Sequence, residues 1–451
     1  MFRFEFEKFR RQRILVGVVA LVMLAVYISS AFRGMELMGG WSQEYFWSHP
    51  EYREQMRSYE TEYADAGWIQ ETTEGYHAFV DGNRRTDEEI RAFMEAWYDA
   101  EWMSMGEEAP AYEAVISDPY NFQYAHDVLK TEAYESEEFE YFSRAFRIYL
   151  PLAENAPEYL RGLQEKYTMY KSWSGRQEAD WNQMAEEVFA DFTPVMGYSC
   201  GWDVLLCVGQ RLPYTLGLVL LAALCTSFSA ERASFMIPLL RTTRYGRRSL
   251  VFTKLIRAWL ITTVLWLIFQ LGMLFAVAVS YGLEGAEVTV MLGYLGYPSA
   301  WGLNNLQYYL IQSVFSYFGT LLQGLLICLM SCLFRARLSL PAGLVLTLIL
   351  GFPNESFFSS DMCFSLWQKT AALTPTQMMG AFTTLQSYQS YDIGICLLQL
   401  PFAVVIAMIL EAAVMIMGIF ILSSGFRRLK RGSGVMRQNM SSNTFSLSRG
   451  K

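Results

Sequence analysis

The sequence predicts an all-α polytopic membrane protein with six transmembrane helices and a large, mostly helical extracellular domain between the first and second spans. Its 451 residues are 53% hydrophobic and 16% aromatic, which is more apolar than one soluble fold. Its charges are also sorted along the chain. Residues 33–205 hold 35 Asp and Glu against 13 Lys and Arg, whereas the remainder holds 9 against 23. These observations predict an acidic domain outside the membrane and a basic, membrane-bound half.

The N-terminal stretch combines a basic segment with an apolar one. Residues 1–13 place phenylalanines at helical spacing among basic residues, which indicates an interfacial helix on the cytoplasmic surface. Residues 14–32 follow without a charge and make about 29 Å of helix, enough for the first transmembrane span. A signal peptide cleaved near Ala31 fits the same length and flanks and stays open as an alternative. Both interpretations place the chain after residue 32 outside the cell.

Residues 33–205 contain no spanning segment and predict an acidic helical domain. Apolar residues recur at helical spacing, for instance at Trp181, Met184, Val188 and Phe192. Such aromatic stripes could hold a ligand, but packing of a core explains them with fewer assumptions. The acidic excess is interpreted as a solvated face, with binding of cations or cationic peptides as the alternative.

Five further apolar segments follow within a transmembrane domain at 206–426, and a basic, Ser-rich cytoplasmic tail closes the chain at 427–451. The spans are predicted at about 212–230, 258–283, 306–334, 338–352 and 393–422. The fifth is short, so it needs a thinned bilayer or neighbouring helices. Lys and Arg beside a span stay on the cytoplasmic side, and every basic cluster falls on that side in the six-span arrangement. Both termini are therefore predicted to be cytoplasmic, with the protein in the cell (plasma) membrane.

The segment 231–254, between the second and third spans, is dense in cations. They are Arg232, Arg241, Arg244, Arg247, Arg248 and Lys254. Its apolar residues, among them Phe235, suit a short amphipathic helix at the membrane surface. On charge alone, the loop is a topology signal and nothing more.

The order of residue types in this loop resembles the first cytoplasmic loop of type-two ABC transporter permeases. In that family a span ends in Glu, and a paired-Leu helix, a Thr-rich turn and an Arg-containing box lead to a Lys that opens the next span. The matching residues here are Glu231, Leu239, Leu240, Thr242, Thr243, Tyr245, Gly246, Arg247 and Lys254. Phe235 departs from the pattern, because the family usually has Gly at this position.

The resemblance implies the permease subunit of an ATP-driven exporter, with a coupling helix that contacts a separate ABC ATP-binding subunit. The residues implied in this contact are Glu231, Arg232, Leu239, Leu240, Thr243, Tyr245, Gly246, Arg247, Arg248 and Lys254. A second permease copy or a paralogue would complete the transport path in the lipid bilayer. ATP and Mg would be bound by the partner, and no cofactor by this chain. The implied substrate is a peptide, an antibiotic or another amphipathic molecule, and residues 353–393 would include re-entrant helices.

Motifs for catalysis or metal binding are missing from the sequence. There is no GxxxxGK[ST], HExxH, GxSxG or EF-hand pattern, and the seven cysteines include no CxxC. The chain is therefore expected not to be an enzyme and not to bind a metal, and no nucleic-acid partner is expected. A disulfide of Cys200 with Cys207 or Cys363 stays open.

One carboxylate, Glu411, lies in the middle of the sixth predicted span. Burying a charge at this depth costs roughly 3 kcal/mol, so such a residue is read as functional by default. The alternative is a structural glutamate that hydrogen-bonds to Gln270, Gln312 or Gln323 on other spans. Both a functional and a structural role of Glu411 stay open. The same holds for the intramembrane amides Gln270 and Gln323.

A second class of function is a non-transporting membrane sensor or assembly protein whose extracellular domain binds a ligand. It predicts the same spans and the same outer domain. It differs in requiring no ATP-binding partner at the arginine-rich loop.

Overall fold

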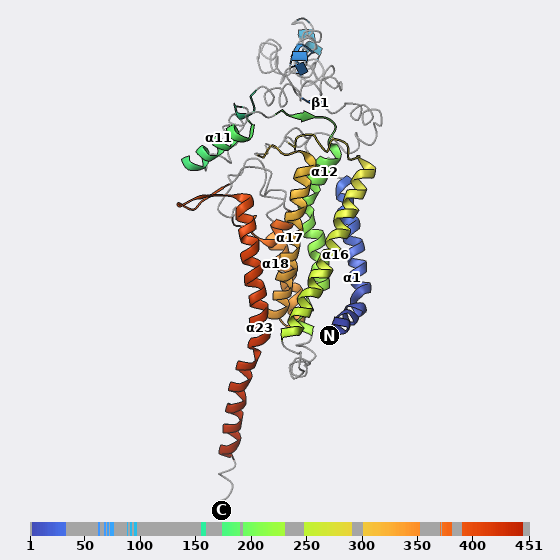
Figure 1. The fold of residues 1–451 in the computed structure, drawn as a ribbon. Helices are drawn as coiled ribbons and strands as arrows, with labels where there is room; N and C mark the ends of the chain where they lie inside the picture. Colours follow the sequence, from blue (N-terminus) through green and yellow to red (C-terminus); the bar gives the residue numbers. More distant parts are fainter. Residues whose placement is uncertain are drawn as a thin grey trace, which may run out of the picture.

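The computed structural model describes residues 2–32, 174–189, 193–230, 248–290, 301–351, 372–380 and 390–444, with short pieces between residues 62 and 158 and residue 370. Most of these residues are helical, and Figure 1 shows the long helices side by side in a bundle. Within the described ranges, five helices are long and apolar enough to cross a membrane, as in an all-α membrane protein.

The elements that form or flank the bundle have the following bounds. The helices are α1 (Phe2–Phe32), α11 (Gly175–Phe189), α12 (Cys200–Val208), η4 (Gly209–Arg211), α13 (Leu212–Leu224), α16 (Arg248–Ser280), α17 (Asn305–Leu333), α18 (Ala336–Gly351), α21 (Pro375–Gly380) and α23 (Leu400–Thr444). Two antiparallel strand pairs lie outside it, β1 (Glu62–Tyr63) with β2 (Val195–Met196) and β3 (Ser390–Asp392) with β4 (Leu397–Gln399).

The second candidate span begins earlier than the sequence predicted. It runs from Cys200 through α12 and η4 to Leu224, whereas the charges of Asp203 and Arg211 had placed its start at Leu212. Asp203 is buried in the first turn of α12, where its carboxylate accepts a hydrogen bond from the Ser199 hydroxyl at 3.0 Å. A helix N-terminus favours a negative charge, so Asp203 lies within the first turn of α12 and not before the helix.

The other helices start and stop within a few residues of the predicted spans, with three exceptions. α1 begins at Phe2, so the predicted interfacial helix and the first span form one continuous helix. α23 continues to Thr444, through most of the segment predicted as a cytoplasmic tail. α16 begins at Arg248 and not near residue 258. Before α23, residues 390–399 form the β3–β4 hairpin, so the helix starts at Leu400 instead of residue 393. α18 is a 16-residue helix with Pro341 inside it, and its apolar part is too short to count among the five candidate spans.

The core of the bundle is built around α13. Its side chains Leu212, Leu216 and Leu220 are fully buried, and α1, α16, α17 and α18 all pack against this helix. α1 is part of the same core, because Tyr27 is buried and its ring contacts Phe269 of α16 at 5.8 Å between centroids. This packing favours a retained first span over a cleaved signal peptide.

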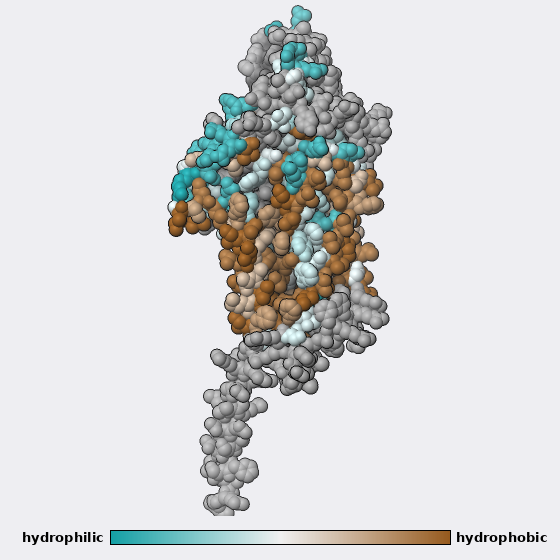
Figure 2. Space-filling model, viewed as in Figure 1, coloured by the Kyte–Doolittle hydropathy of each residue, from teal (hydrophilic) through white to brown (hydrophobic). Residues whose placement is uncertain are grey.

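The outward faces of the helices are apolar. Figure 2 shows a hydrophobic band around the bundle, with hydrophilic residues gathered at the end that carries α11. The exposed side chains of this band include Leu21, Leu271, Phe275, Leu310, Val314, Ile409 and Val414. A soluble protein would not leave so large a contiguous apolar surface in water. The protein is therefore membrane-embedded, with lipid tails covering this band.

Small residues allow the helices to approach closely. A Cβ atom on Gly319 of α17 would lie 2.5 Å from the carbonyl carbon of Met378 and 2.6 Å from the amide nitrogen of Met379, both in α21. A Cβ on Gly343 of α18 would likewise clash with the Leu221 side chain of α13. Helices in lipid associate through such van der Waals contacts, because burial from lipid brings no hydrophobic gain.

Polar contacts join α11 to the β3–β4 hairpin across more than two hundred residues of sequence. The Arg176 guanidinium lies 3.4 Å from the Asp392 carboxylate and donates to the Gly394 carbonyl at 2.8 Å. The Gly394 amide and the Ser174 hydroxyl also donate to Asp392. Together with Arg176, these donors hold the pKa of Asp392 below its ordinary value of 3.8.

We expect Gly319→Val to lower the thermal stability of the detergent-solubilised protein, because the new side chain separates α17 from the backbone of α21. Overpacking of this kind costs about 1–3 kcal/mol. Gly17→Val in α1 is the matched control, since a Cβ there has nothing within 4 Å. Equal melting temperatures for the two variants would contradict the close contact at Gly319.

The hairpin contact should weaken only in acid. Because the pKa of Asp392 is lowered in the folded state, its contribution is complete above the ordinary pKa of 3.8 and is lost as the pH falls through the lowered value. The anisotropy of a fluorophore on the exposed Cys396, in a Cys363→Ser background, should stay constant above about pH 4 and decrease below it. In Asp392→Asn the same signal should be low and independent of pH, and a wild-type-like profile would exclude Asp392 as the titrating group.

Candidate functional site

The predicted coupling segment lies almost entirely outside the described residues. This holds for Glu231, Arg232, Leu239, Leu240, Thr243, Tyr245, Gly246 and Arg247. Of the residues predicted to contact the ATP-binding subunit, Arg248 and Lys254 are placed. Arg248 is the first residue of α16, and Lys254 lies in the second turn of that helix. The structure also describes the end of α13 and the turn up to residue 230, so both attachments of the segment are defined.

Lys254 connects these two attachments. It is only 2% exposed, and its ammonium group donates to the carbonyl of Ser227, in the turn after α13, at 2.7 Å. The same nitrogen lies 4.8 Å from the centre of the Phe228 ring. A carbonyl acceptor and an aromatic face both stabilise a cation that has lost much of its water. Lys254 therefore fixes the start of α16 to the end of α13.

Two serines attach the same turn to α17 and α18. The Ser331 hydroxyl of α17 accepts hydrogen bonds from the amides of Phe228 and Ser229, both at 3.0 Å. The Ser339 hydroxyl of α18 donates to the Cys225 carbonyl at 2.7 Å. Backbone groups at a helix end have no partners within the helix, and a membrane offers none. Side chains from three neighbouring helices thus satisfy backbone groups at the end of α13.

Gln323, one of the predicted intramembrane polar residues, joins three elements. Its amide nitrogen donates to the Thr347 hydroxyl of α18 at 3.1 Å, and its oxygen accepts from the Thr376 hydroxyl of α21 at 3.0 Å. Gln323 is buried, and both ends of its amide are used. This arrangement stabilises the packing of α17 against α18 and α21.

Gln270 belongs to a row of polar side chains between α16 and α17, which we call the polar seam. Its members are Trp259, Thr263, Trp266 and Gln270 on α16 and Ser316 and Tyr317 on α17. The Trp259 indole and the Thr263 hydroxyl lie 3.2 and 3.0 Å from the Tyr317 hydroxyl. The Trp266 indole and the Gln270 amide donate to the Ser316 hydroxyl at 3.3 and 3.5 Å. The four α16 residues lie on one face of the helix, since they are spaced by three or four positions.

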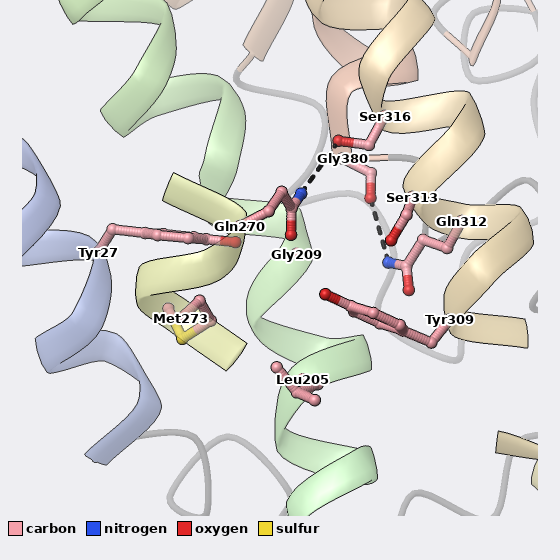
Figure 3. Close-up of a pocket in the computed structure, with 10 residues that line it drawn as sticks. All are labelled: Tyr27, Leu205, Gly209, Gln270, Met273, Tyr309, Gln312, Ser313, Ser316 and Gly380. Carbon is pink, nitrogen blue, oxygen red and sulfur yellow. Dashed lines mark hydrogen bonds between the residues drawn. The ribbon is translucent and has the colours of Figure 1, made fainter. Parts of the chain in front are cut away.

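The polar seam ends at a small cavity, which we call the seam cavity (Figure 3). Its lining comes from α1, α12, η4, α16, α17 and α21, through Tyr27, Leu205, Gly209, Gln270, Met273, Tyr309, Gln312, Ser313, Ser316 and Gly380. The amide nitrogen of Gln312 donates to the carbonyls of Leu206 and Gly380, each at 3.3 Å. The sequence predicted Gln312 only as a possible partner for Glu411. No pattern in the apolar spans predicted the cavity.

Glu411 lies on the face of α23 that packs against α17, between Met408 and Met415. Its Oε2 atom is buried and has no hydrogen-bond partner among the described residues. The three glutamines suggested as partners donate elsewhere: Gln270 to Ser316, Gln312 to two carbonyls and Gln323 to Thr347. The proposed pairing of Glu411 with an amide is therefore not present in the described part of the bundle.

The cysteine and metal hypotheses can be addressed in part. Cys207 carries a free thiol, so a disulfide between Cys200 and Cys207 is not formed, whereas Cys363 lies outside the described residues. No group of three or more His, Cys, Asp or Glu side chains able to hold a metal ion occurs in the ranges that the structure describes.

Comparisons with models of protein families, with curated proteins and with solved structures gave no match to this chain.

We expect Lys254→Met to destabilise the protein, because it leaves the buried Ser227 carbonyl without its charged donor. A hydrogen bond to a charged group contributes about 1.5–3 kcal/mol. Arg335→Met, at an exposed cation just after α17, is the matched control and should leave thermal stability nearly unchanged. If the two variants melt alike in detergent, Lys254 does not hold the end of α13.

Proposed function

We propose that this protein is the membrane-spanning permease subunit of an ATP-driven ABC exporter. The observation that carries the proposal is the order of residue types in the segment 231–254, from a Glu through paired leucines and a Tyr-Gly-Arg box to a Lys that opens the next helix. The position of Lys254 supports it, because this residue joins α16 to the end of α13 at the base of the segment.

The proposed topology places both termini in the cytoplasm and residues 33–199 outside the cell. In Figure 1 the N-terminus, the start of α16 and the C-terminal part of α23 all lie toward the same end of the bundle. Basic residues mark each of these places in the sequence, which supports assigning that end to the cytoplasm. α18 would be the fifth of six spans, shortened and completed by its neighbours.

The coupling mechanism follows from the attachments of the segment. Two ATP-binding subunits would close on ATP and Mg and push on residues 231–247 from the cytoplasm. Lys254, Ser331 and Ser339 would pass this displacement from the end of α13 to α16, α17 and α18. Paired with a second permease copy or a paralogue, the bundle would alternate between inward-facing and outward-facing states. This chain alone would hydrolyse nothing.

The substrate class is inferred from the outer domain and the membrane setting. An acidic domain of this size would receive or hand over the exported molecule outside the cell, and its charge would attract a cationic partner. A peptide, an antibiotic or another amphipathic molecule fits these conditions. The same domain also supports the second candidate, a membrane sensor or assembly protein that binds a ligand without transport.

Affinity purification of the tagged chain from gently solubilised membranes distinguishes the two functions. We expect a P-loop ATPase to co-purify with the wild-type chain and to be lost, by about tenfold or more, from the double variant Arg247→Glu, Arg248→Glu, since charge reversal at a docking surface opposes association. The matched control is Arg335→Glu, Arg337→Glu, which makes the same charge change where α18 begins after α17. It should keep the ATPase.

Failure to recover any ATPase under conditions that preserve other ABC complexes would exclude the permease assignment and favour the sensor. Equal loss of the ATPase from both double variants would instead show that the 231–254 segment is not the specific docking site.

A further inference from the structure

We propose that the seam cavity binds the hydroxyl group of an amphiphile that enters from the bilayer, with the polar seam guiding that group and the lipid-facing side chains of α16 and α17 contacting its apolar tail. The proposal rests on the cavity and its membrane setting and does not require coupling to an ATPase.

The first reason is an unused acceptor. Gln312 is 5% exposed, and its Oε1 atom is buried without a hydrogen-bond partner among the described residues. Its orientation is fixed, because the nitrogen of the same amide donates to the carbonyls of Leu206 and Gly380. A buried, unpaired carbonyl oxygen costs about 1–3 kcal/mol, so the site favours a molecule that brings a donor. The ligand must therefore carry an O–H or N–H group.

The second reason is the neutral, hydrogen-bonding character of the lining. Figure 3 shows the rings of Tyr27 from α1 and Tyr309 from α17 entering the cavity from opposite sides, with Gln270 between them. Ser313 and Ser316 add two more hydroxyl groups, and no Asp, Glu, Lys or Arg lines the space. Phenol and serine hydroxyls can both donate and accept, so they complement a hydroxyl group from several directions. A charged head group would find no counter-ion in this lining.

The third reason is size. The centre of a water molecule can reach only about 10 Å³ of the cavity, which is room for roughly one water. A sugar or a phosphate head group does not fit in this space. A single hydroxyl group is the size that this space admits, and Gln312 is part of its lining.

The polar seam provides the route. Between Trp259 and Gln270 it runs for about 17 Å along α16, at 1.5 Å per residue. Trp259 is 51% exposed, and Gln270 is half-buried, so the seam reaches from the outer face of the bundle to the cavity. Figure 2 shows less hydrophobic residues interrupting the apolar band on this face. Hydrogen-bonding groups at membrane depth are costly unless they have partners, and a hydroxyl that moves along the seam finds one at each turn.

The apolar side chains next to the seam favour a lipid-like occupant over a partner helix. Leu271 follows Gln270, Leu310 follows Tyr309 and Val314 follows Ser313, and all three are more than half exposed. They offer a surface for an alkyl chain while the hydroxyl enters the cavity.

The test uses photoreactive octanol that carries a diazirine on the carbon next to its hydroxyl-bearing carbon, so that the reactive group lies at the cavity, and its methyl ether, which lacks the hydroxyl donor. After illumination in membranes, mass spectrometry maps the labelled residues. We expect octanol to label the lining around Tyr27, Met273 and Tyr309, with excess unlabelled octanol competing. The methyl ether should label these residues about fivefold less, the effect of losing one hydrogen bond. Both probes should label the lipid face of α23 around Ile409 equally.

Two variants test the acceptor. Gln312→Met keeps the length of the side chain and removes the oxygen, so it should reduce octanol labelling of the cavity about fivefold. Leu333→Met, on the exposed far end of α17, is the matched control and should leave it unchanged. If Gln312→Met does not fold, Ser313→Ala makes a smaller change in the same lining, and the comparison of the two probes on the wild-type protein decides by itself. Equal labelling of the cavity by octanol and its methyl ether would overturn the proposal.

Discussion

A bilayer supplies no hydrogen bonds, so each buried polar group in this bundle needs a partner from the chain itself. The end of α13 shows this constraint most clearly. In the turn that follows it, two carbonyls and two amides are satisfied by Lys254 of α16, Ser331 of α17 and Ser339 of α18. Because α13 belongs to the most buried of the five candidate spans among the described residues, the same contacts that satisfy its end hold the surrounding helices in register. At the end of α13, the packing of the helices and the hydrogen bonding of buried backbone groups therefore depend on one another.

This dependence gives the proposed coupling its physical basis. Lipid does not drive helices together as water does, so close contact at small residues such as Gly319 and Gly343 supplies much of the attraction between them. Contacts of this kind tolerate little sliding. A force applied to residues 231–247 would meet a turn whose hydrogen bonds reach three other helices, and these helices would respond together.

Hydropathy and charge were enough to predict the helical membrane fold, because runs such as residues 14–32 and 400–423 carry no charge except Glu411. The start of the second span was missed, since Asp203 has a local partner that a hydropathy profile cannot show. Ser331 and Ser339 gave no signal either, because a serine in an apolar run is usually unremarkable. Tyr245, Arg247 and the rest of the coupling box lie outside the described residues, so their role stays a prediction.

Two glutamines of α17 show that a structural and a functional side chain are distinguished by their hydrogen-bond partners and not by their sequence surroundings. Gln323 and Gln312 are both buried in the same apolar helix, and their sequence surroundings are alike. Thr347 and Thr376 bind the nitrogen and the oxygen of the Gln323 amide, so neither atom is left without a partner. Leu206 and Gly380 use only the nitrogen of Gln312. A protein that needed Gln312 only to join helices would gain by pairing its oxygen as well, because an unpaired carbonyl destabilises the fold. The unpaired oxygen, placed beside a cavity of one-water size at the end of a polar seam, is better explained by a hydroxyl-bearing ligand.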